Sequence, residues 1–223
     1  FSERSEPRRP RLRRTSGMRA ARDRDRGALR PQLLCEFFEV CIHTILCSRE
    51  VYPEAIFSEQ RAFGVPVRMS RHPDLNKYII DVLDEVRDLI RSDKAQQLVV
   101  SINDAAGTTV RERFVFNIEA SDDGRGNGPV EVEHVEEIEY LMRSLLCKLQ
   151  LANLPKPRAD STFALLVYAR DGVAGALDVP EGWIDATTDS ISTPRTTPTL
   201  VPIKTVAADL ASFDLFVECH AAR

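Results

Sequence analysis

Apolar side chains recur at helical spacing along three parts of the chain. The first stripe begins near Pro31 and ends before Tyr52, and the second follows Pro73, whose missing N–H costs nothing in the first turn of a helix. The third stripe starts in an acidic segment and runs to Leu149. Apolar residues spaced three and four apart give each segment one buried face, so the sequence predicts three amphipathic helices.

Shorter apolar segments predict strands. A β-branched run over 98–102, a turn, and the alternating pattern of Phe114–Ile118 indicate an antiparallel hairpin. Phe163–Ala169 is apolar almost throughout, which is typical of a central strand buried on both faces. Leu200–Thr205 and Phe213–Glu218 predict two strands near the end of the chain.

The segments between these elements differ in character. Val65-Pro66-Val67 lies in what we expect to be an irregular connection between the first two helices, and residues 120–130 predict a flexible loop. Residues 171–199 hold few core-type residues and contain the only tryptophan, Trp183. A loose segment of this length inside a compact domain is functional or disordered.

The order of helices and strands predicts an α+β fold in which an antiparallel sheet is backed by three helices. We divide the chain into an arginine-rich leader (1–29), a core (30–170) and a C-terminal segment (171–223). The leader predicts either a disordered segment or a nuclear import signal centred on Arg8–Arg14.

The net charge of −4 hides an asymmetry, because residues 1–30 hold eleven arginines and only four acidic residues. The remainder is strongly acidic and is therefore expected to bind no nucleic acid through the core. A nucleic-acid-binding protein that acts through the basic leader stays an alternative hypothesis. No apolar run approaches the roughly 20 residues that span a bilayer, so we expect no membrane partner.

The sequence offers no recognisable catalytic or metal-binding pattern. The five cysteines include no CxxC pair, and the four histidines are scattered. His43 is expected to be a hydrogen-bonded structural residue and His72 a helix cap or surface residue. The glycines at 124, 126 and 128 stand among acidic residues that would repel a pyrophosphate. We therefore expect a protein that is not an enzyme and has no cofactor or metal.

Several blocks resemble a known family, that of the HORMA-domain accessory subunit of DNA polymerase zeta, also called the mitotic spindle assembly checkpoint protein 2B family. They are Leu34–Val40, Arg49–Phe57, Val65–Ile79, Arg113–Phe116 and Leu200–Thr205. The resemblance extends over about residues 30–219 and is poor at 120–130 and 171–199. The runner-up is the spindle checkpoint HORMA protein, to which Val179–Trp183 is closer.

The resemblance implies a HORMA domain whose C-terminal segment is a safety belt that closes over an extended peptide of a partner. It implies that Tyr78 and Trp183 bind the peptide. It also implies that Leu200, Asp214 and Phe216 meet a scaffold polymerase. The family has glutamine and tyrosine at the last two positions, so this chain adds a charge and lacks a phenol hydroxyl there.

Arg143 and, more weakly, Glu50 match residues that the family uses when two HORMA domains pair. The implied partners are the catalytic subunit of DNA polymerase zeta, the deoxycytidyl-transferase scaffold polymerase of translesion synthesis, shieldin-type repair factors, and a second HORMA protein. The implied function is a non-catalytic adaptor in DNA damage tolerance, with further roles in double-strand break repair and cell-cycle control. The implied location is the nucleus, with the cytoplasm and the spindle as further places.

Overall fold

The computed structural model describes residues 26–120, 132–155, 160–170, 197–208 and 210–220, and the following account is confined to them. Three α-helices are present, α2 (Arg26–Ser48), α3 (Pro73–Arg91) and α4 (Val132–Gln150), together with a short 3-10 helix, η2 (Glu54–Ile56). Seven strands form two antiparallel sheets. The bounds of the strands are β1 (Phe57–Ala62), β2 (Val65–Ser70), β3 (Ala95–Asn103), β4 (Val110–Ile118), β5 (Thr162–Ala169), β6 (Thr199–Ala207) and β7 (Ser212–Cys219).

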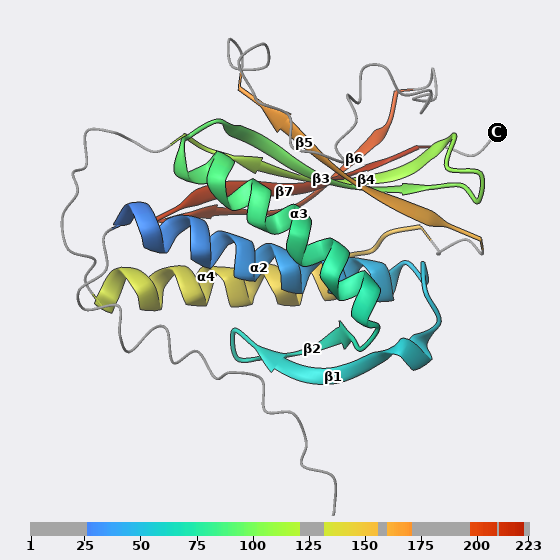
Figure 1. Cartoon of the computed structure of the whole chain (residues 1–223), viewed down its shortest axis with the longest axis horizontal. Helices are drawn as coiled ribbons and strands as arrows, with labels where there is room; N and C mark the ends of the chain where they lie inside the picture. Colours follow the sequence, from blue (N-terminus) through green and yellow to red (C-terminus); the bar gives the residue numbers. More distant parts are fainter. Residues whose placement is uncertain (1–25, 121–131, 156–159, 171–196, 209, 221–223) are drawn as a thin grey trace, which may run out of the picture.

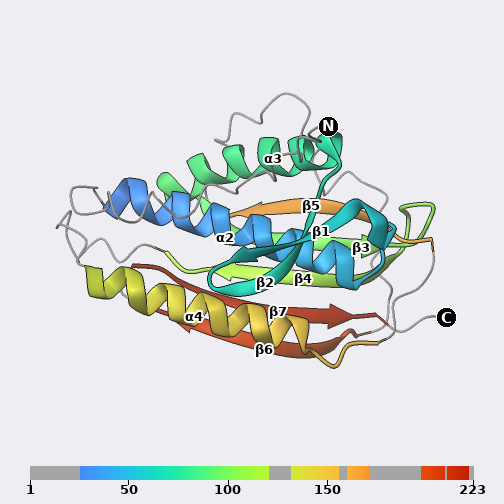
Figure 2. The ribbon, with the colours of Figure 1, turned by 90° about the horizontal axis from the view of Figure 1, so that it is seen from below.

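The main sheet has five strands in the order β5-β3-β4-β7-β6 (Figure 1). The three helices pack on one face of it. Figure 2 shows α2 over the middle of the sheet, α4 over β6 and β7, and α3 along the β5 side. This arrangement confirms the predicted α+β fold, an antiparallel sheet backed by three helices.

The core lies between α2 and the middle of the sheet. Phe37 and Phe38 of α2 are fully buried against Phe213 of β7, with ring centroids 5.6 and 5.8 Å away. The ring of Phe38 also lies 5.0 Å from that of Phe116 on β4. Aromatic pairs at these distances add to the free energy that burial alone contributes. The helical stripe and the alternating strands therefore meet in one core.

Helix α2 begins at Arg26, five residues before the expected start near Pro31. Residues 26–29, which the division by sequence assigned to the leader, belong to this helix. The expectations for the two histidines are confirmed. His43 Nδ1 accepts a hydrogen bond from the Ser70 amide (3.4 Å), and the His72 side chain caps α3 by accepting one from the Leu75 amide (3.4 Å).

The connection expected to be irregular is a β-hairpin, β1–β2, so that expectation was wrong. The chain reverses at Phe63 and Gly64, whose φ values are both positive (48° and 76°). Two consecutive positive φ angles are the signature of a tight hairpin turn that suits twisted strands. Proline is unusual inside a strand because it has no N–H to donate. Pro66, however, stands at a position where no main-chain N–H is needed for pairing with β1.

The expectation that Phe163–Ala169 is a central strand was also wrong. Among the described residues β5 pairs only with β3 and lies at one edge of the sheet, and the inner strands are β3, β4 and β7. Leu165 is the one residue of β5 that is buried. A continuous apolar run indicates two covered faces, but it does not show whether another strand lies alongside.

Candidate peptide-binding site

The free edge of β5 is the part of the described structure that is best placed to receive an extended peptide. Within the described residues, β5 pairs with β3 on one side and with no strand on the other. An edge strand of this kind presents main-chain donors and acceptors to a strand from another protein. Such pairing supplies affinity, and neighbouring side chains supply specificity.

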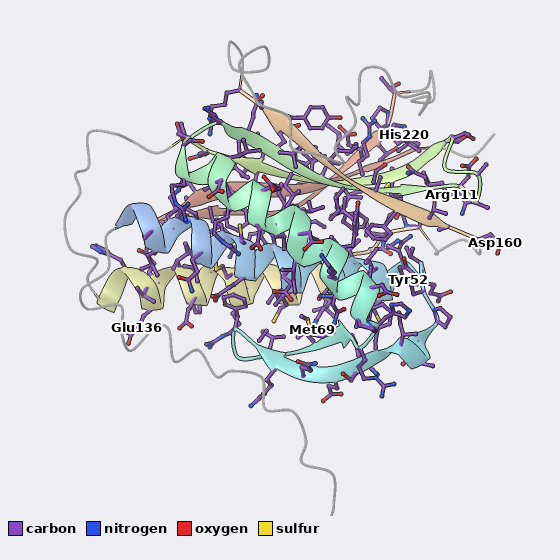
Figure 3. All side chains as sticks on the ribbon, viewed as in Figure 1. Tyr52, Met69, Arg111, Glu136, Asp160 and His220 are labelled. Atoms are coloured by element: carbon purple, nitrogen blue, oxygen red, sulfur yellow. The ribbon has the colours of Figure 1, made fainter. Side chains whose placement is uncertain are left out.

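Three aromatic residues gather at the start of this edge. The ring of Phe163 on β5 lies 5.8 Å from that of Tyr78 on α3 and 6.1 Å from that of Tyr52, and both contacts are edge-to-face. Figure 3 shows Tyr52 at the end of the molecule where Asp160 leads into β5. Tyr78 keeps 43% of its surface exposed. The cluster therefore offers aromatic faces next to an unpaired strand.

The Tyr78 hydroxyl is partly withdrawn from water. Burial raises the pKa of this hydroxyl, and a hydrogen bond with the backbone of Leu165 opposes the shift. The contact with Leu165 places Tyr78 beside the main chain of β5. Tyr78 is therefore both a residue of the packed α3 stripe and a part of the candidate site.

Side chains fix both ends of β5. At its start, Thr162 Oγ1 donates to the carbonyl of Asp104 (2.9 Å). Just beyond its end, Arg170 donates to the carbonyls of Ile118 (3.0 Å) and Asp93 (3.1 Å). These contacts join β5 to the rest of the fold, so a peptide would meet a pre-organised edge.

A buried ion pair holds the chain that leads into β5. Arg49 Nη2, at the end of α2, lies 2.7 Å from Glu112 Oε1 on β4 and donates to the carbonyl of Pro155 at 2.6 Å. Both side chains are almost fully buried. Removal of one partner from such a pair leaves a buried charge uncompensated, so this contact is a strong constraint on the α4–β5 connection.

The structure brings one of the two predicted peptide-binding residues to this edge. Tyr78 lies there, whereas Trp183 is outside the described residues. Tyr52 and Phe163 were not predicted as site residues. Tyr52 stands inside a block that carries the family resemblance, and its position before Pro53 was the signal available.

The residues predicted to meet a scaffold polymerase lie on the β6–β7 hairpin, on the sheet face opposite the helices. Leu200 on β6 is 60% exposed, whereas Asp214 and Phe216 on β7 are half-buried. The cross-strand partner of Phe216 is Pro202, two residues from Leu200. The hairpin thus places all three residues on one surface, and the scaffold contact itself stays a prediction.

The two residues predicted to take part in the pairing of two HORMA domains, Arg143 and Glu50, do not contact each other in the structure. Arg143 on α4 donates from Nε to the carbonyl of Phe63 (3.0 Å), at the tip of the β1–β2 hairpin. Glu50 is exposed just after α2. No hydrogen bond or ion pair joins Arg143 to Glu50 in the part of the chain that is described. Arg143 therefore has an intramolecular role, and pairing stays a prediction.

The described residues show no assembled catalytic or metal centre. No group of three or more His, Cys, Asp or Glu among them is placed to hold a metal ion. Burial raises the pKa of the Cys35 thiol to about 12 and also raises that of Cys41, so neither thiol is activated as a nucleophile. None of the described helices combines the length and apolar character that crossing a membrane requires.

Comparison with known proteins agrees with this architecture. The HORMA domain family matches residues 32–201. The mitotic spindle assembly checkpoint protein MAD2B of Homo sapiens is 34% identical over 201 residues, which are 86% of this chain and 92% of that protein. MAD2B of Danio rerio is 33% identical over 199 residues, with the same shares of the two chains. MAD2A of Dictyostelium discoideum is 30% identical over 155 residues, 68% of this chain and 73% of that protein.

Solved structures share the fold at lower identity. A chain of the mitotic checkpoint complex superposes with a TM-score of 0.71 at 23% identity, covering 86% of this chain and 98% of that one. HTP-2 bound to a motif of HTP-3 gives a TM-score of 0.66 at 12% identity, with 86% and 90% coverage. The extent of the family match and the identity to MAD2B show that the chain belongs to the HORMA-domain family and, within it, to the MAD2B proteins.

Proposed function

We propose that this protein is a non-catalytic adaptor that holds an extended peptide of a partner along the free edge of β5. The observation that carries the proposal is that the outer edge of β5 pairs with no other described strand and lies beside the half-exposed aromatic cluster of Tyr52, Tyr78 and Phe163. Main-chain pairing gives such a complex its affinity, and the rings give it side-chain selectivity. HTP-2, which shares the fold, is itself bound to a motif of HTP-3.

The partner that we favour is a proline-containing segment of the catalytic subunit of DNA polymerase zeta. Aromatic grooves suit proline-rich segments because such segments are already extended and lose little entropy on binding. The identity to MAD2B supports this choice over other HORMA partners. In this proposal the part of the C-terminal segment 171–223 that precedes β6 closes over the peptide as the safety belt, and Trp183 packs against the peptide. Strands β6 and β7 attach the belt to the main sheet.

The β6–β7 surface would then present the complex to the scaffold polymerase in the nucleus. Leu200 is a large apolar side chain with more than half its surface exposed, so it is accessible to a partner. Asp214 gives this surface a charge, so we expect the scaffold to meet it with a basic group. Roles in double-strand break repair with shieldin-type factors and in cell-cycle control extend the same proposal.

The proposal is tested by titrating the full chain with a fluorescent peptide of the polymerase zeta catalytic subunit, measuring both affinity and release. We expect tight binding and slow release, because closure of a belt lowers the dissociation rate more than it raises the association rate. Trp183→Ala and Tyr78→Ala should each weaken binding. Tyr140→Ala is the matched control, since Tyr140 is 66% exposed on α4, away from the β5 edge.

A second candidate is a spindle checkpoint protein, favoured by the identity to MAD2A. It predicts the same clamp with different peptides. The second candidate replaces the first if the folded protein does not bind the polymerase peptide but binds peptides of spindle checkpoint partners. Tyr78→Ala should then weaken binding of those peptides in the same way. Failure to bind either set would overturn the clamp.

A further inference from the structure

Strand β1 is the outer strand of the β1–β2 hairpin, which lies on the far side of the helical layer from the main sheet (Figure 1). Its partner β2 contacts α2 and carries the buried side chains of Val65, Val67 and Met69. On its other side, β1 pairs with no described strand. Such an edge offers main-chain donors and acceptors to a further strand.

The main-chain groups of Glu59 and Arg61 point to this open side. The residue pairs of an antiparallel hairpin alternate between pairs that exchange hydrogen bonds and pairs that make none. Pro66 has no N–H, so its pair with Arg61 is of the second kind, and so is the pair two residues further along, Glu59 with Arg68. No described group bonds to the outward main chain of Glu59 or Arg61. Within the described structure, two donors and two acceptors are therefore available.

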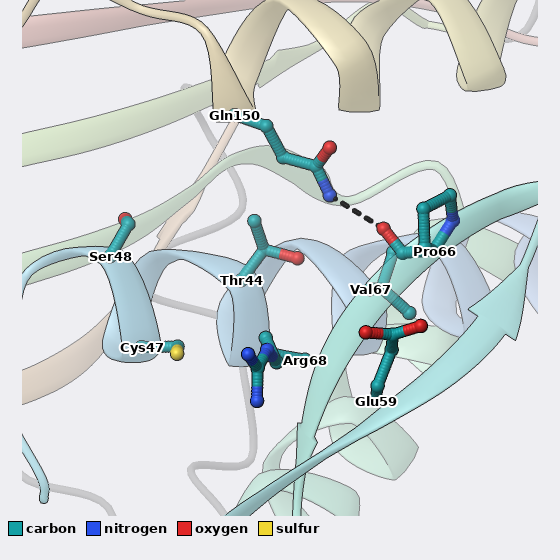
Figure 4. Close-up of a pocket in the computed structure, with 8 residues that line it drawn as sticks. All are labelled: Thr44, Cys47, Ser48, Glu59, Pro66, Val67, Arg68 and Gln150. Carbon is teal, nitrogen blue, oxygen red and sulfur yellow. Dashed lines mark hydrogen bonds between the residues drawn. The ribbon is translucent and has the colours of Figure 1, made fainter. Parts of the chain in front are cut away.

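The outer edge of β2, by contrast, is closed. Gln150 Nε2 donates to the carbonyl of Pro66 (2.9 Å, dashed in Figure 4). The Ser70 amide donates to His43 Nδ1 (3.4 Å), and the Ser70 carbonyl accepts from Asn76 Nδ2 (3.0 Å). The hairpin can therefore be extended at β1 and not at β2.

Two exposed charges of opposite sign stand on either side of the middle of β1. Glu59 and Arg61 flank Gln60 on the solvent face, and neither forms an ion pair with a described residue. Arg68, the cross-strand neighbour of Glu59, is engaged with Glu54 at 3.3 Å. Charged side chains on an edge strand usually oppose further pairing. Here, however, a reversal of the strand direction about Gln60 exchanges the two charges.

A second copy of β1, placed antiparallel to the first about Gln60, matches both the charges and the main chain. Glu59 then lies opposite Arg61 of the other copy, and Arg61 lies opposite its Glu59. These positions also carry the outward N–H and C=O groups, so each pair exchanges two hydrogen bonds. A register shift of one residue would misplace these hydrogen bonds, and a shift of two would set like charges opposite each other.

The centre of this arrangement brings the two Gln60 side chains opposite each other. Gln60 Oε1 is buried and has no hydrogen-bond partner within the described structure. A buried acceptor without a donor costs free energy. The side-chain amide of the other copy can supply the missing donor.

We propose that β1 is a self-association surface, through which two copies of this protein form a symmetric dimer with a continuous four-stranded sheet in the order β2-β1-β1-β2. The interface is isologous, since the same strand serves both copies. Opposite charges that face each other across two strands stabilise their pairing, and like charges destabilise it. The hairpin and the main sheet lie on opposite sides of the helices, so each copy keeps its β5 edge (Figure 1).

The test is sedimentation velocity of the full-length protein over a range of concentrations, where we expect a monomer–dimer equilibrium. Glu59→Arg and Arg61→Glu each set like charges opposite each other at both pairs, so each should weaken dimerisation about tenfold or more. An equimolar mixture of the two variants should dimerise again. In the mixed dimer the introduced arginine faces the introduced glutamate, and the native Arg61 of one chain faces the native Glu59 of the other.

The double variant Glu59→Arg/Arg61→Glu restores opposite charges at both pairs and should dimerise as the wild type does. Glu85→Arg, which reverses an exposed carboxylate on α3, is the matched control and should leave the equilibrium unchanged. Amide hydrogen exchange at Glu59 and Arg61 should slow as the protein concentration rises. Thermal unfolding checks that each variant is folded.

The proposal is overturned if the wild type is a monomer at every concentration. It is also overturned if the single variants dimerise as the wild type does, because pairing would then use another surface. Failure of the mixed variants to dimerise would exclude the antiparallel register about Gln60 and would overturn the proposal as well.

Discussion

The two ends of the five-stranded sheet are built in opposite ways. At the β6 end, Ile203 and Val206 are buried, and Lys204 Nζ donates to Ser144 Oγ of α4 (2.9 Å). Pro202 and a register shift interrupt the same strand. At the β5 end, only Leu165 is buried, and no described element covers the outer side of the strand.

Because of this difference, further strand pairing is disfavoured at the β6 edge, whereas the β5 edge can accept another strand. Proline and bulges disfavour further pairing, and a helix that packs on a strand fixes its position. Strand β5 contains no proline, and the register shift in its pairing with β3 lies at the far end of the strand from the aromatic cluster. Its contact with α3 leaves Tyr78 43% exposed. In one sheet, therefore, the β6 end stabilises the fold and the β5 end is available for binding.

The largest expected contrast compares one phenylalanine near each end. Phe213→Ala on β7 should lower the free energy of unfolding by about 3–5 kcal/mol, because a fully buried ring leaves a cavity. Phe163→Ala on β5 should cost about 1 kcal/mol, since its ring is only partly buried. Urea denaturation measures both, and equal losses would contradict the proposed division between the two ends.

Acid should weaken the helical layer that both ends share. Burial lowers the pKa of His43, which is 1% exposed, to about 4, against about 6.5 in an unfolded chain. The unfolded state therefore binds a proton first, so stability present above pH 6.5 is lost as pH falls towards 4, by about 3 kcal/mol in all. His43→Gln should remove this part of the pH dependence, which denaturation at several pH values measures. An identical pH profile in the variant would show that His43 is not responsible.

The aromatic cluster should affect binding far more than folding. Tyr78→Ala should weaken peptide binding by about 2 kcal/mol, as expected of an aromatic residue at the centre of an interface. Its unfolding free energy should change by less, because Tyr78 is nearly half exposed. Calorimetric titration beside denaturation separates the two effects. A loss confined to stability would make Tyr78 a core residue only.

The smallest effect concerns the contact between β6 and α4. Lys204→Met removes the hydrogen bond to Ser144 and keeps most of the apolar stem, so we expect a loss of about 1 kcal/mol. Amide hydrogen exchange should show faster exchange in β6 and β7 and no change in β5. Lys77→Met is a suitable control because Lys77 forms only an exposed pair with Asp81. Faster exchange throughout the sheet would argue against a local role.

Most elements could be predicted from the sequence, because periodicity records which face of each helix or strand is buried. The stripes of α3 and α4 and the β3–β4 hairpin are of this kind. The β1–β2 hairpin was missed because its turn, Phe63-Gly64, lacks the usual asparagine and because Pro66 argued against a strand. For the site, the family resemblance pointed to Tyr78, but nothing in the sequence connected it with Phe163, 85 residues away along the chain.

By itself the sequence determined the fold class, the three helices and the family, since these depend on local spacing and on blocks of matching residues. Only the tertiary structure decided which strand lies at the edge, because the apolar run of Phe163–Ala169 is the same whether its neighbour is a strand or open space. The structure also decided that Arg143 binds the β1–β2 hairpin. Which strands pair, and which way a side chain points, depends on residues that are distant in the chain. The pattern of one segment therefore cannot predict either.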